Sequence, residues 1–353
     1  MNPDIFLSPK ANSYNGSNDT KIIRSSLDQF YFLPKDEIVT TFVVGSQILT
    51  KNQSDTFTKT IQQKVSEQQS LLESKIIDAV DTRILNKNPS IAKPIYSTQD
   101  HDAPLYIRNT DCWAYDLDLT SISPWNSTEG KNRAGTLISP RHVLFCEHLN
   151  YYPDDGATIR FITSDNNIIT KTITSVIGHQ EYFSQFRSRN FADIAIGVLD
   201  SDVPSSISFA KVLPQDWKKY IPNLDSSSLY GSPEFTLPTL NLDAEEKALV
   251  GDLFNLSISA VFIQPVDSTR LSFYESIISG DSGNPSFLII NNELVLITVW
   301  SSGGPGLGSN IIYTGEGYPG TEVDYVQDIN TMMSVLGGGY SLTHINLQNI
   351  LYT

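Results

Sequence analysis

Residues 280–285 read Gly-Asp-Ser-Gly-Asn-Pro, and an apolar run from Ser286 to Ile290 follows them directly. A serine hydroxyl is a weak nucleophile, so acyl transfer needs a neighbouring base and donors for the oxyanion that develops on the attacked carbonyl. The glycines of this stretch let the backbone turn tightly, which brings the amides of Gly280 and Ser282 and the serine side chain toward one spot. A Gly-Asp-Ser-Gly tetrapeptide also occurs as an ordinary turn, so the rest of the sequence must decide.

Two other stretches offer a base and an acid. His148 follows two short β-rich runs, Ala134 to Ser139 and His142 to Cys146, which a Ser-Pro turn joins. A base placed just after a strand is held by the scaffold and still faces solvent. Asp193 lies in the apolar stretch 191–199. A carboxylate in such company is costly to bury unless a donor is bonded to it, and an imidazole N–H would serve.

Together these segments resemble the trypsin-like serine proteases of the chymotrypsin fold. The stretch Gly280 to Pro285 is similar to the family's Gly-Asp-Ser-Gly-Gly-Pro loop, with Asn284 in place of its last glycine. Gly135 to Ser139 and Val143 to His148 are similar to the segments around the family's histidine, and Asp193 to Ile196 is similar to its Asp-Ile-Ala-Leu strand. The order is the family's, with 45 residues from histidine to aspartate and 89 from aspartate to serine.

The resemblance covers about residues 105–336 and implies a mainly β fold of two six-stranded antiparallel β-barrels with a C-terminal helix. It implies that Ser282 attacks a peptide carbonyl, that His148 is the general base and then the general acid, and that Asp193 orients the imidazole. The oxyanion hole would be formed by the amides of Gly280 and Ser282. No cofactor and no metal is implied.

The resemblance also assigns substrate-binding positions. The floor of the primary pocket would be Ser276, six residues before the nucleophile, and one wall would follow Val299, Trp300 and Ser301. An uncharged Ser276 argues against a preference for Lys or Arg, because those cations would enter a site without a counter-charge. We therefore expect a neutral or apolar substrate side chain in this pocket.

Three features depart from the family pattern. Cys146-Glu147-His148-Leu149 lacks the cysteine that usually follows the histidine, so the disulfide of that loop is missing and an acid stands beside the base. No Ile-Val-Gly-Gly stretch precedes Gly135, so Asp281 needs a partner other than a freed N-terminus: a Lys or Arg, or backbone donors. The tail 337–353 has no counterpart in the family pattern.

Beyond residue 105, short β-rich runs are separated by clusters of Asn, Asp, Gly, Ser and Pro, which is typical of an all-β barrel or sandwich. These runs are Ala134 to Ser139, His142 to Cys146, Ala157 to Thr163, Asn167 to Ile177, Ala192 to Leu199, Ser257 to Gln264, Ser286 to Ile290 and Leu294 to Val299. Asn291 and Asn292 tolerate positive φ and predict a hairpin connection. A closing helix is expected from Val326 to Leu336, ended by the glycines 337–339.

Residues 1–104 form a separate N-terminal region in this interpretation, irregular at first and then helical. The stretch from Lys51 to Lys87 has no Gly or Pro and carries apolar residues at helical spacing on one narrow stripe. Such a stripe over residues 55–86 either forms a coiled coil that joins copies of the chain into a homo-oligomer or packs on its own domain. Pro89, Pro94 and Pro104 then predict a linker.

Charge and hydropathy limit the partners. Of 353 residues, 24 are Lys or Arg and 39 are Asp or Glu, giving a formal charge of −15. Nucleic acids and anionic membranes bind clustered cations, which this chain lacks, so neither is expected as a partner. No apolar run approaches the roughly 18 residues of a membrane helix. The first residues, MNPDIFLSPK, lack the pattern of a secretory signal, and the compartment stays open.

The remaining cysteines and histidines do not predict a metal site. Cys112 and Cys146 either form one disulfide or are buried free thiols. His142 is expected to be packed within its strand. No ligand-like spacing is found around the other three histidines, His101, His179 and His344.

The sequence therefore predicts a serine endopeptidase that acts on protein or peptide substrates through an acyl-enzyme. It would carry an N-terminal region (1–104), a protease domain (105–336) and a C-terminal tail (337–353). The alternative is a structural or adhesive protein of a virus-like or surface particle, in which a catalytically silent protease-like domain is assembled through the N-terminal region.

Overall fold

The computed structural model describes residues 22–25, 41–44, 47–48, 51–125, 127, 134–148, 155–184, 192–224, 235–256, 260–302, 307–310 and 324–347. The chain divides into two compact units, Met1–Glu73 and Ser74–Thr353. The boundary falls inside helix α1 (Lys51–Ile84), which occupies the stretch where helical spacing was expected. Assembly of several copies through residues 55–86 stays a prediction.

The smaller unit contains three short strands besides its part of α1. They are β1 (Ile22–Ser25), β2 (Thr41–Val44) and β3 (Gln47–Ile48). Strand β2 pairs in parallel with β1 and antiparallel with β3, so the three strands form one small sheet.

The first large sheet of the Ser74–Thr353 unit is antiparallel and six-stranded. Its order is β6 (Ile122–Ser123), β7 (Gly135–Leu137), β8 (His142–Phe145), β11 (Ala195–Leu199), β10 (Ile168–Gly178) and β9 (Thr158–Ile162). The two edge strands β6 and β9 contact each other, so the sheet is a nearly closed barrel. The mainly β prediction is confirmed to this extent.

Aromatic packing fills the interior of this barrel. Phe145, Phe161 and Val143 are fully buried in one hydrophobic cluster. A Cβ at Gly135 would lie 2.5 Å from the Phe145 ring and 2.7 Å from Val143, so only glycine fits opposite these side chains. Small and large residues at facing positions thus let the strands close around the core.

The second sheet has seven strands. Its order is β12 (Lys211–Val212), β17 (Glu293–Ser302), β16 (Pro285–Ile290), β13 (Leu237–Leu242), β14 (Ala248–Leu256), β15 (Ala260–Ile263) and β18 (Leu307–Asn310). Strand β18 also pairs with β17, so the strands from β17 to β18 form a closed ring of pairings. Asn291 and Asn292 join β16 to β17 with φ of 53° and 62°, as their tolerance of positive φ predicted.

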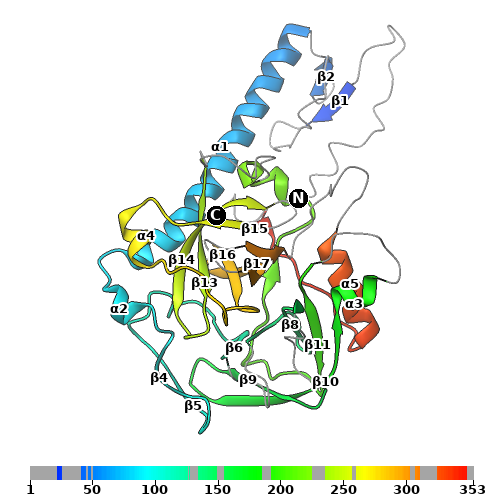
Figure 1. The fold of residues 1–353 in the computed structure, drawn as a ribbon. Helices are drawn as coiled ribbons and strands as arrows, with labels where there is room; N and C mark the ends of the chain where they lie inside the picture. Colours follow the sequence, from blue (N-terminus) through cyan, green and yellow to red (C-terminus); the bar gives the residue numbers. More distant parts are fainter. Residues whose placement is uncertain are drawn as a thin grey trace. The chain divides into compact units, whose positions relative to one another are not determined.

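The helices beyond α1 are short and lie beside the sheets (Figure 1). They are α2 (Pro89–Ala92), α3 (His179–Phe183), α4 (Ser268–Ser272) and α5 (Tyr325–Leu336), with 3₁₀ turns at Trp217–Lys219 and Pro222–Leu224. Helix α5 is the predicted closing helix, and it ends at Gly337, whose φ is 86°. It packs against α3, β10 and β11.

Residues 89–108 form structure where a linker was expected. Pro89 stands at the start of α2, a position that tolerates proline because the first helical amides have no partner within the helix. Strands β4 (Tyr96–Asp100) and β5 (Leu105–Arg108) then pair antiparallel. Ala92 and Ile95 are buried in the same core cluster as residues of both large sheets. The boundary between the two compact units lies at residue 73, within α1, and the domain bounds at residues 104 and 336 stay a prediction.

The tail that follows α5 runs along the edge of the second sheet. The Val212 amide of β12 donates to Thr343, and the Ile345 amide donates to Val212. The Tyr340 hydroxyl donates to Asp202, 2.6 Å away, beyond the end of β11. Residues 337–345 therefore contact segments attached to both large sheets.

The C-terminal end of α1 belongs to the core of the larger unit. Val80 and Ile84 are 0% and 1% exposed and pack with residues of both sheets. Arg270 of α4 bonds the Asp81 carboxylate through two nitrogens at 2.7 Å each. For residues 74–84, packing on the chain's own domain is thus observed.

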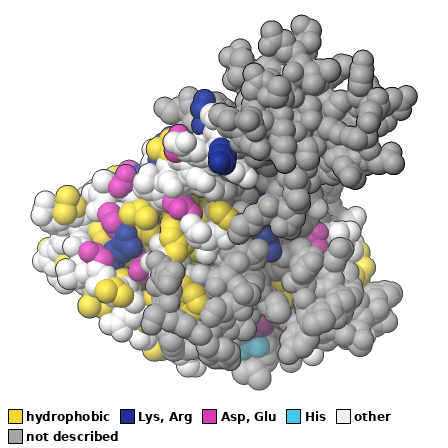
Figure 2. Space-filling view, turned by 90° about the horizontal axis from the view of Figure 1, so that it is seen from above, with side chains coloured by type: hydrophobic (Ala, Val, Ile, Leu, Met, Phe, Trp, Pro, Cys, Tyr) yellow, Lys and Arg dark blue, Asp and Glu magenta, His cyan; other side chains and the backbone are white. Residues whose placement is uncertain are grey.

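Figure 2 shows hydrophobic, acidic and basic side chains interspersed on the coloured part of one face. None of the helices in the described ranges combines the length and the apolar character needed to cross a membrane.

Ile84, the last residue of α1, and Leu85, which follows it, test the packing of this helix end. Ile84→Ala should lower the free energy of unfolding by about 2–4 kcal/mol, because it empties a buried position. Leu85→Ala, at a position 60% exposed, should change it by less than about 0.5 kcal/mol. Urea denaturation followed by circular dichroism measures both. Equal effects of the two substitutions would contradict the burial of Ile84.

Candidate functional site

Strand pairing brings His148 and Asp193 together. Phe145 at the end of β8 pairs with Ala195 at the start of β11. The residues that follow β8 and those that precede β11 therefore lie at the same end of these two strands. His148 Nδ1 lies 2.5 Å from Asp193 Oδ2. Both side chains are partly exposed, at 28% and 21%. The structure thus places the predicted base against the predicted acid.

Backbone amides fix the Asp193 carboxylate. Its Oδ1 accepts from the Glu147 amide at 2.8 Å and from the His148 amide at 2.5 Å, while Oδ2 contacts the imidazole. An ionised carboxylate with these partners holds the proton of a neutral imidazole on Nδ1. In this tautomer Nε2 of His148 carries the lone pair, so Nε2 is the nitrogen that would act as a base.

The loop around Ser282 is turned by two glycines with positive φ, 110° at Gly280 and 87° at Gly283. The Asp281 amide donates to Ile278, and the Gly283 amide donates to Trp300. Within the described parts of the chain, no group accepts from the amides of Gly280 or Ser282. These are the two amides that the sequence analysis assigned to an oxyanion hole, and both are free to bind a ligand oxygen.

The Asp281 side chain has backbone partners. It is 3% exposed; Oδ1 accepts from the Ala244 amide at 2.9 Å and Oδ2 from the Ile278 amide at 2.8 Å. The sequence left two kinds of partner open for Asp281, a Lys or Arg side chain or backbone donors, and the structure shows backbone donors. Ala244 lies in the turn between β13 and β14, so this turn supports the Ser282 loop without a free N-terminus.

The Ser282 loop lies against the segment that leads to His148. A Cβ built on Gly283 would be 3.5 Å from both the Cys146 amide nitrogen and the Ala134 carbonyl oxygen. Cys146 precedes His148 by two residues, and Gly283 follows Ser282. The nucleophile candidate on the second sheet and the base candidate on the first thus stand on segments so close that a Cβ at Gly283 would reach van der Waals contact with Cys146.

The predicted substrate-binding residues differ in exposure. Ser276 is exposed, with its hydroxyl 3.4 Å from that of Tyr274. Val299 and Trp300 are 0% and 1% exposed, and the Trp300 indole donates to the Leu242 carbonyl and packs on a phenylalanine. Ser301 is half-buried. Any wall formed at Val299 and Trp300 therefore consists of backbone, because their side chains belong to the core.

Cys112, Cys146 and His142 are buried in the protein core. Cys112 and Cys146 are free and buried, which decides between the two alternatives, and burial raises the pKa of Cys112 to about 11. His142 bonds Ser139 within the core, and burial lowers its pKa. Within the described ranges, no group of three or more His, Cys, Asp or Glu side chains could hold a metal ion.

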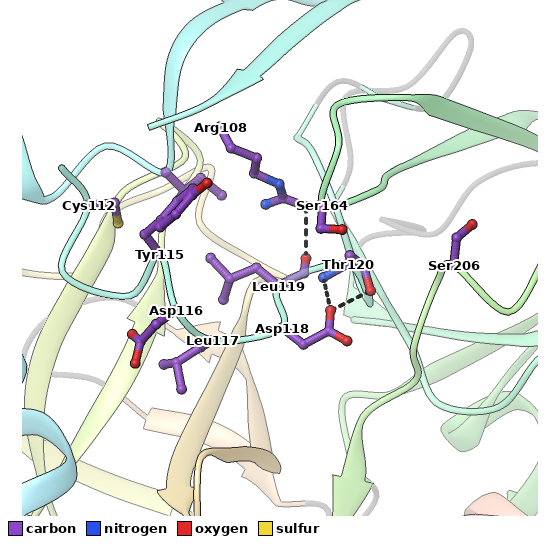
Figure 3. A pocket seen from close by; sticks show the side chains of 11 residues that line it. Arg108, Cys112, Tyr115, Asp116, Leu117, Asp118, Leu119, Thr120, Ser164 and Ser206 are labelled. Atoms are coloured by element: carbon purple, nitrogen blue, oxygen red, sulfur yellow. Dashed lines mark hydrogen bonds between the residues drawn. The ribbon is translucent and has the colours of Figure 1, made fainter. Parts of the chain in front are cut away.

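Figure 3 shows a cavity of about 360 Å³ together with the side chains that line it. It is lined by Ile95, Arg108, Cys112, Tyr115, Asp116, Leu117, Asp118, Leu119, Thr120, Ser164 and Ser206. Several of its polar groups are bonded: Arg108 Nη2 donates to the Ile162 carbonyl, Asp116 pairs with Arg83, and Asp118 accepts from Thr120. Arg108 Nη1 is buried without a hydrogen-bond partner among the described residues. The cavity includes none of the three candidate catalytic residues.

Comparison with protein-family models and with curated proteins found no match for this chain. The site is therefore defined by its own geometry: a histidine–aspartate pair on the first sheet and, on the second, a serine loop close to the histidine segment. The hydrogen bonds of the described residues include none between Ser282 and His148.

The β13–β14 turn, which contacts the Ser282 loop, carries a second buried acid, Asp243. Burial raises the pKa of Asp243 to about 6, and the nearby charge of Asp281 contributes to the rise. Its Oδ1 accepts from the amides of Glu245 and Lys247. Because the folded-state pKa exceeds the usual 3.8, the folded protein binds this proton more tightly than the unfolded chain. Stability contributed by the proton is lost as pH rises from about 4 through about 6.

Asp243→Asn should therefore raise the free energy of unfolding at pH 8 by roughly 1–3 kcal/mol and change it little at pH 4. The amide oxygen of Asn keeps the two backbone bonds and removes the charge that faces Asp281. Urea denaturation at the two pH values measures the difference. Asp102→Asn, at an exposed position, serves as the control. An Asp243→Asn protein less stable than the parent at pH 8 would contradict this account.

Proposed function

We propose that this protein is a serine endopeptidase that uses Ser282, His148 and Asp193. The observation that carries the proposal is the 2.5 Å contact between His148 and an aspartate held by two backbone amides, beside a serine loop with two free amides. A base oriented by an acid, a hydroxyl and paired oxyanion donors are the parts that acyl transfer requires.

In this mechanism Nε2 of His148 takes the proton from the Ser282 hydroxyl as its oxygen attacks the peptide carbonyl. The amides of Gly280 and Ser282 donate to the resulting oxyanion. The imidazolium, stabilised by ionised Asp193, then gives its proton to the leaving amine as the C–N bond breaks. Water attacks the acyl-enzyme by the same route, with His148 as the base, and releases the carboxylic acid and the free serine.

The fold supports a trypsin-like arrangement. The acid–base pair lies at the ends of two central strands, β8 and β11, of the first barrel, and the serine loop precedes β16 of the second sheet. We propose that the second sheet is the second barrel of a chymotrypsin-like fold, with strand pairing around β17, β16, β13, β14, β15 and β18. The backbone partners of Asp281 supply the support that a freed N-terminus gives in many members of that family.

The proposed substrate is a protein or peptide. A neutral or apolar side chain would occupy the pocket above Ser276, because Ser276 offers no charge to a basic side chain. Val299, Trp300 and Ser301 would line one wall of the substrate site with their backbone, since the side chains of Val299 and Trp300 are buried.

The alternative, a catalytically silent structural protein assembled through residues 55–86, does not need the two free amides or the aligned histidine–aspartate pair. The proposed enzyme uses both, and for that reason we favour it.

Replacing the nucleophile tests the proposal. Ser282→Ala should lower kcat on a casein-derived peptide roughly 10⁶-fold, leaving the contribution of the oxyanion donors and of substrate binding. Ser279→Ala, an exposed serine of the same loop, should leave kcat within about twofold. A serine-reactive phosphonate should label Ser282, as located by mass spectrometry. Cleavage by Ser282→Ala at the parental rate, or equal labelling of that variant, would refute the assignment.

A further inference from the structure

The acid beside the candidate base is bound to a helix. Glu147 Oε2 accepts from the Gln180 amide at 2.7 Å, and Oε1 accepts from the Glu181 amide at 3.0 Å. Both amides belong to the first turn of α3, where they have no partner within the helix. The backbone amide of Glu147 donates to Asp193 Oδ1 at 2.8 Å. This residue therefore joins α3 to the carboxylate that orients His148.

The space for this contact is created by Gly178, which precedes α3. A Cβ at Gly178 would lie 2.2 Å from Glu147 Oε1 and 2.7 Å from its carboxyl carbon, so any other residue would displace the carboxylate. The φ of Gly178 is −83°, which all residues adopt, so the glycine here provides room instead of an unusual backbone angle.

The same helix holds the other side of the pair. The His179 backbone amide donates to the Ile194 carbonyl at 2.8 Å, and the Ala192 amide donates to His179 Nδ1 at 3.3 Å. The two residues that flank Asp193 in the chain are thus both bonded to His179. Because Nδ1 accepts an amide proton, a neutral His179 carries its own proton on Nε2.

A buried acid anchors His179. Its Nε2 lies 3.1 Å from Asp328 Oδ2 of α5, and both side chains are 3% exposed. The rings of Phe183 and Tyr325 lie 4.8 Å and 5.9 Å from the imidazole, centroid to centroid. Packing and hydrogen bonds together fix the ring, and they tie α3 to the C-terminal helix.

We propose that Glu147 and His179 are positioning residues: through α3 they hold His148 and Asp193 in the geometry of proton transfer. The inference rests on the proposed function. It explains how the histidine segment is held although Cys146 forms no disulfide and the cysteine that usually follows the family's histidine is missing. A shift of about 1 Å in a catalytic group costs as much as 10²-fold in rate, so such anchoring has a measurable effect.

The ionisation of Glu147 is compatible with this role. Burial raises the pKa of its carboxyl, and the charge of Asp193 acts in the same direction. The amides of Gln180 and Glu181 and the nearby His179 act in the opposite direction, because they favour the carboxylate.

Glu147→Ala should lower kcat roughly 10- to 100-fold and change KM less than about threefold, because the base is misplaced while substrate binding is retained. Glu147→Gln keeps one acceptor oxygen and should recover most of kcat. Glu181→Ala removes an exposed acid from the same helix and should have no effect. Gly178→Ala pushes the Glu147 carboxylate off α3 without altering Glu147 itself and should reproduce the loss.

Nuclear magnetic resonance separates this inference from the proposed activity. The His148 Nδ1 proton, bonded to Asp193, should give a far-downfield signal in the histidine-labelled Ser282→Ala protein, assigned by its loss in His148→Ala. Adding Glu147→Ala, Gly178→Ala or His179→Ala should broaden or abolish the signal, whereas adding Glu181→Ala should not. A sharp signal in the Glu147→Ala protein, with an unchanged kcat, would overturn the inference. The expected signal losses in a parent that cleaves no peptide would support the positioning and refute the endopeptidase.

Discussion

Hydrogen bonds from backbone amides to carboxylates hold the candidate site together. Asp193 accepts from two amides beside the imidazole, Asp281 from Ala244 and Ile278, and Glu147 from the first turn of α3. With 39 acidic and 24 basic residues, the chain has too few cations to pair with every acid. A backbone amide binds a carboxylate without a second charged side chain, and the fold fixes its position. Each such bond therefore orients the carboxylate as well as stabilising it.

In the proposed enzyme this arrangement would replace two devices on which the resembled family often relies. The serine loop is bonded to the β13–β14 turn, which would take the place of a freed N-terminus. The histidine segment is supported by α3 through Glu147, so its position requires no disulfide. In both cases the supporting element is itself packed on a large sheet, which transfers the rigidity of the sheet to the site.

Local patterns predicted the parts of the fold that depend on local chemistry. Asn291 and Asn292 indicated a hairpin because their side chains tolerate positive φ, and the glycines after Leu336 indicated the end of α5. The prediction of a linker after residue 89 was wrong, because Pro89 begins the short helix α2. Proline restricts the backbone equally in both situations, so the residue alone does not distinguish them.

The site was predictable where side chains carry the chemistry and not where backbone groups do. His148 and Asp193 were paired from the sequence, and the structure places them in contact. The Ala244 donor to Asp281 and the acceptor for the α3 amides were not identified, since any backbone amide can donate and these partners lie 37 and 33 residues apart in the sequence. Glu147 was noted only as unusual, because its partners become adjacent only after folding.

The tail beyond α5 has a consequence for the behaviour of the protein in concentrated solution. Strand β12 is the last strand of its sheet, and its outer edge would offer open donors and acceptors to any neighbouring chain. Thr343 and Ile345 occupy that edge through Val212. The tail thus caps the edge against strand-to-strand association between molecules, which is a common route to aggregation for β proteins.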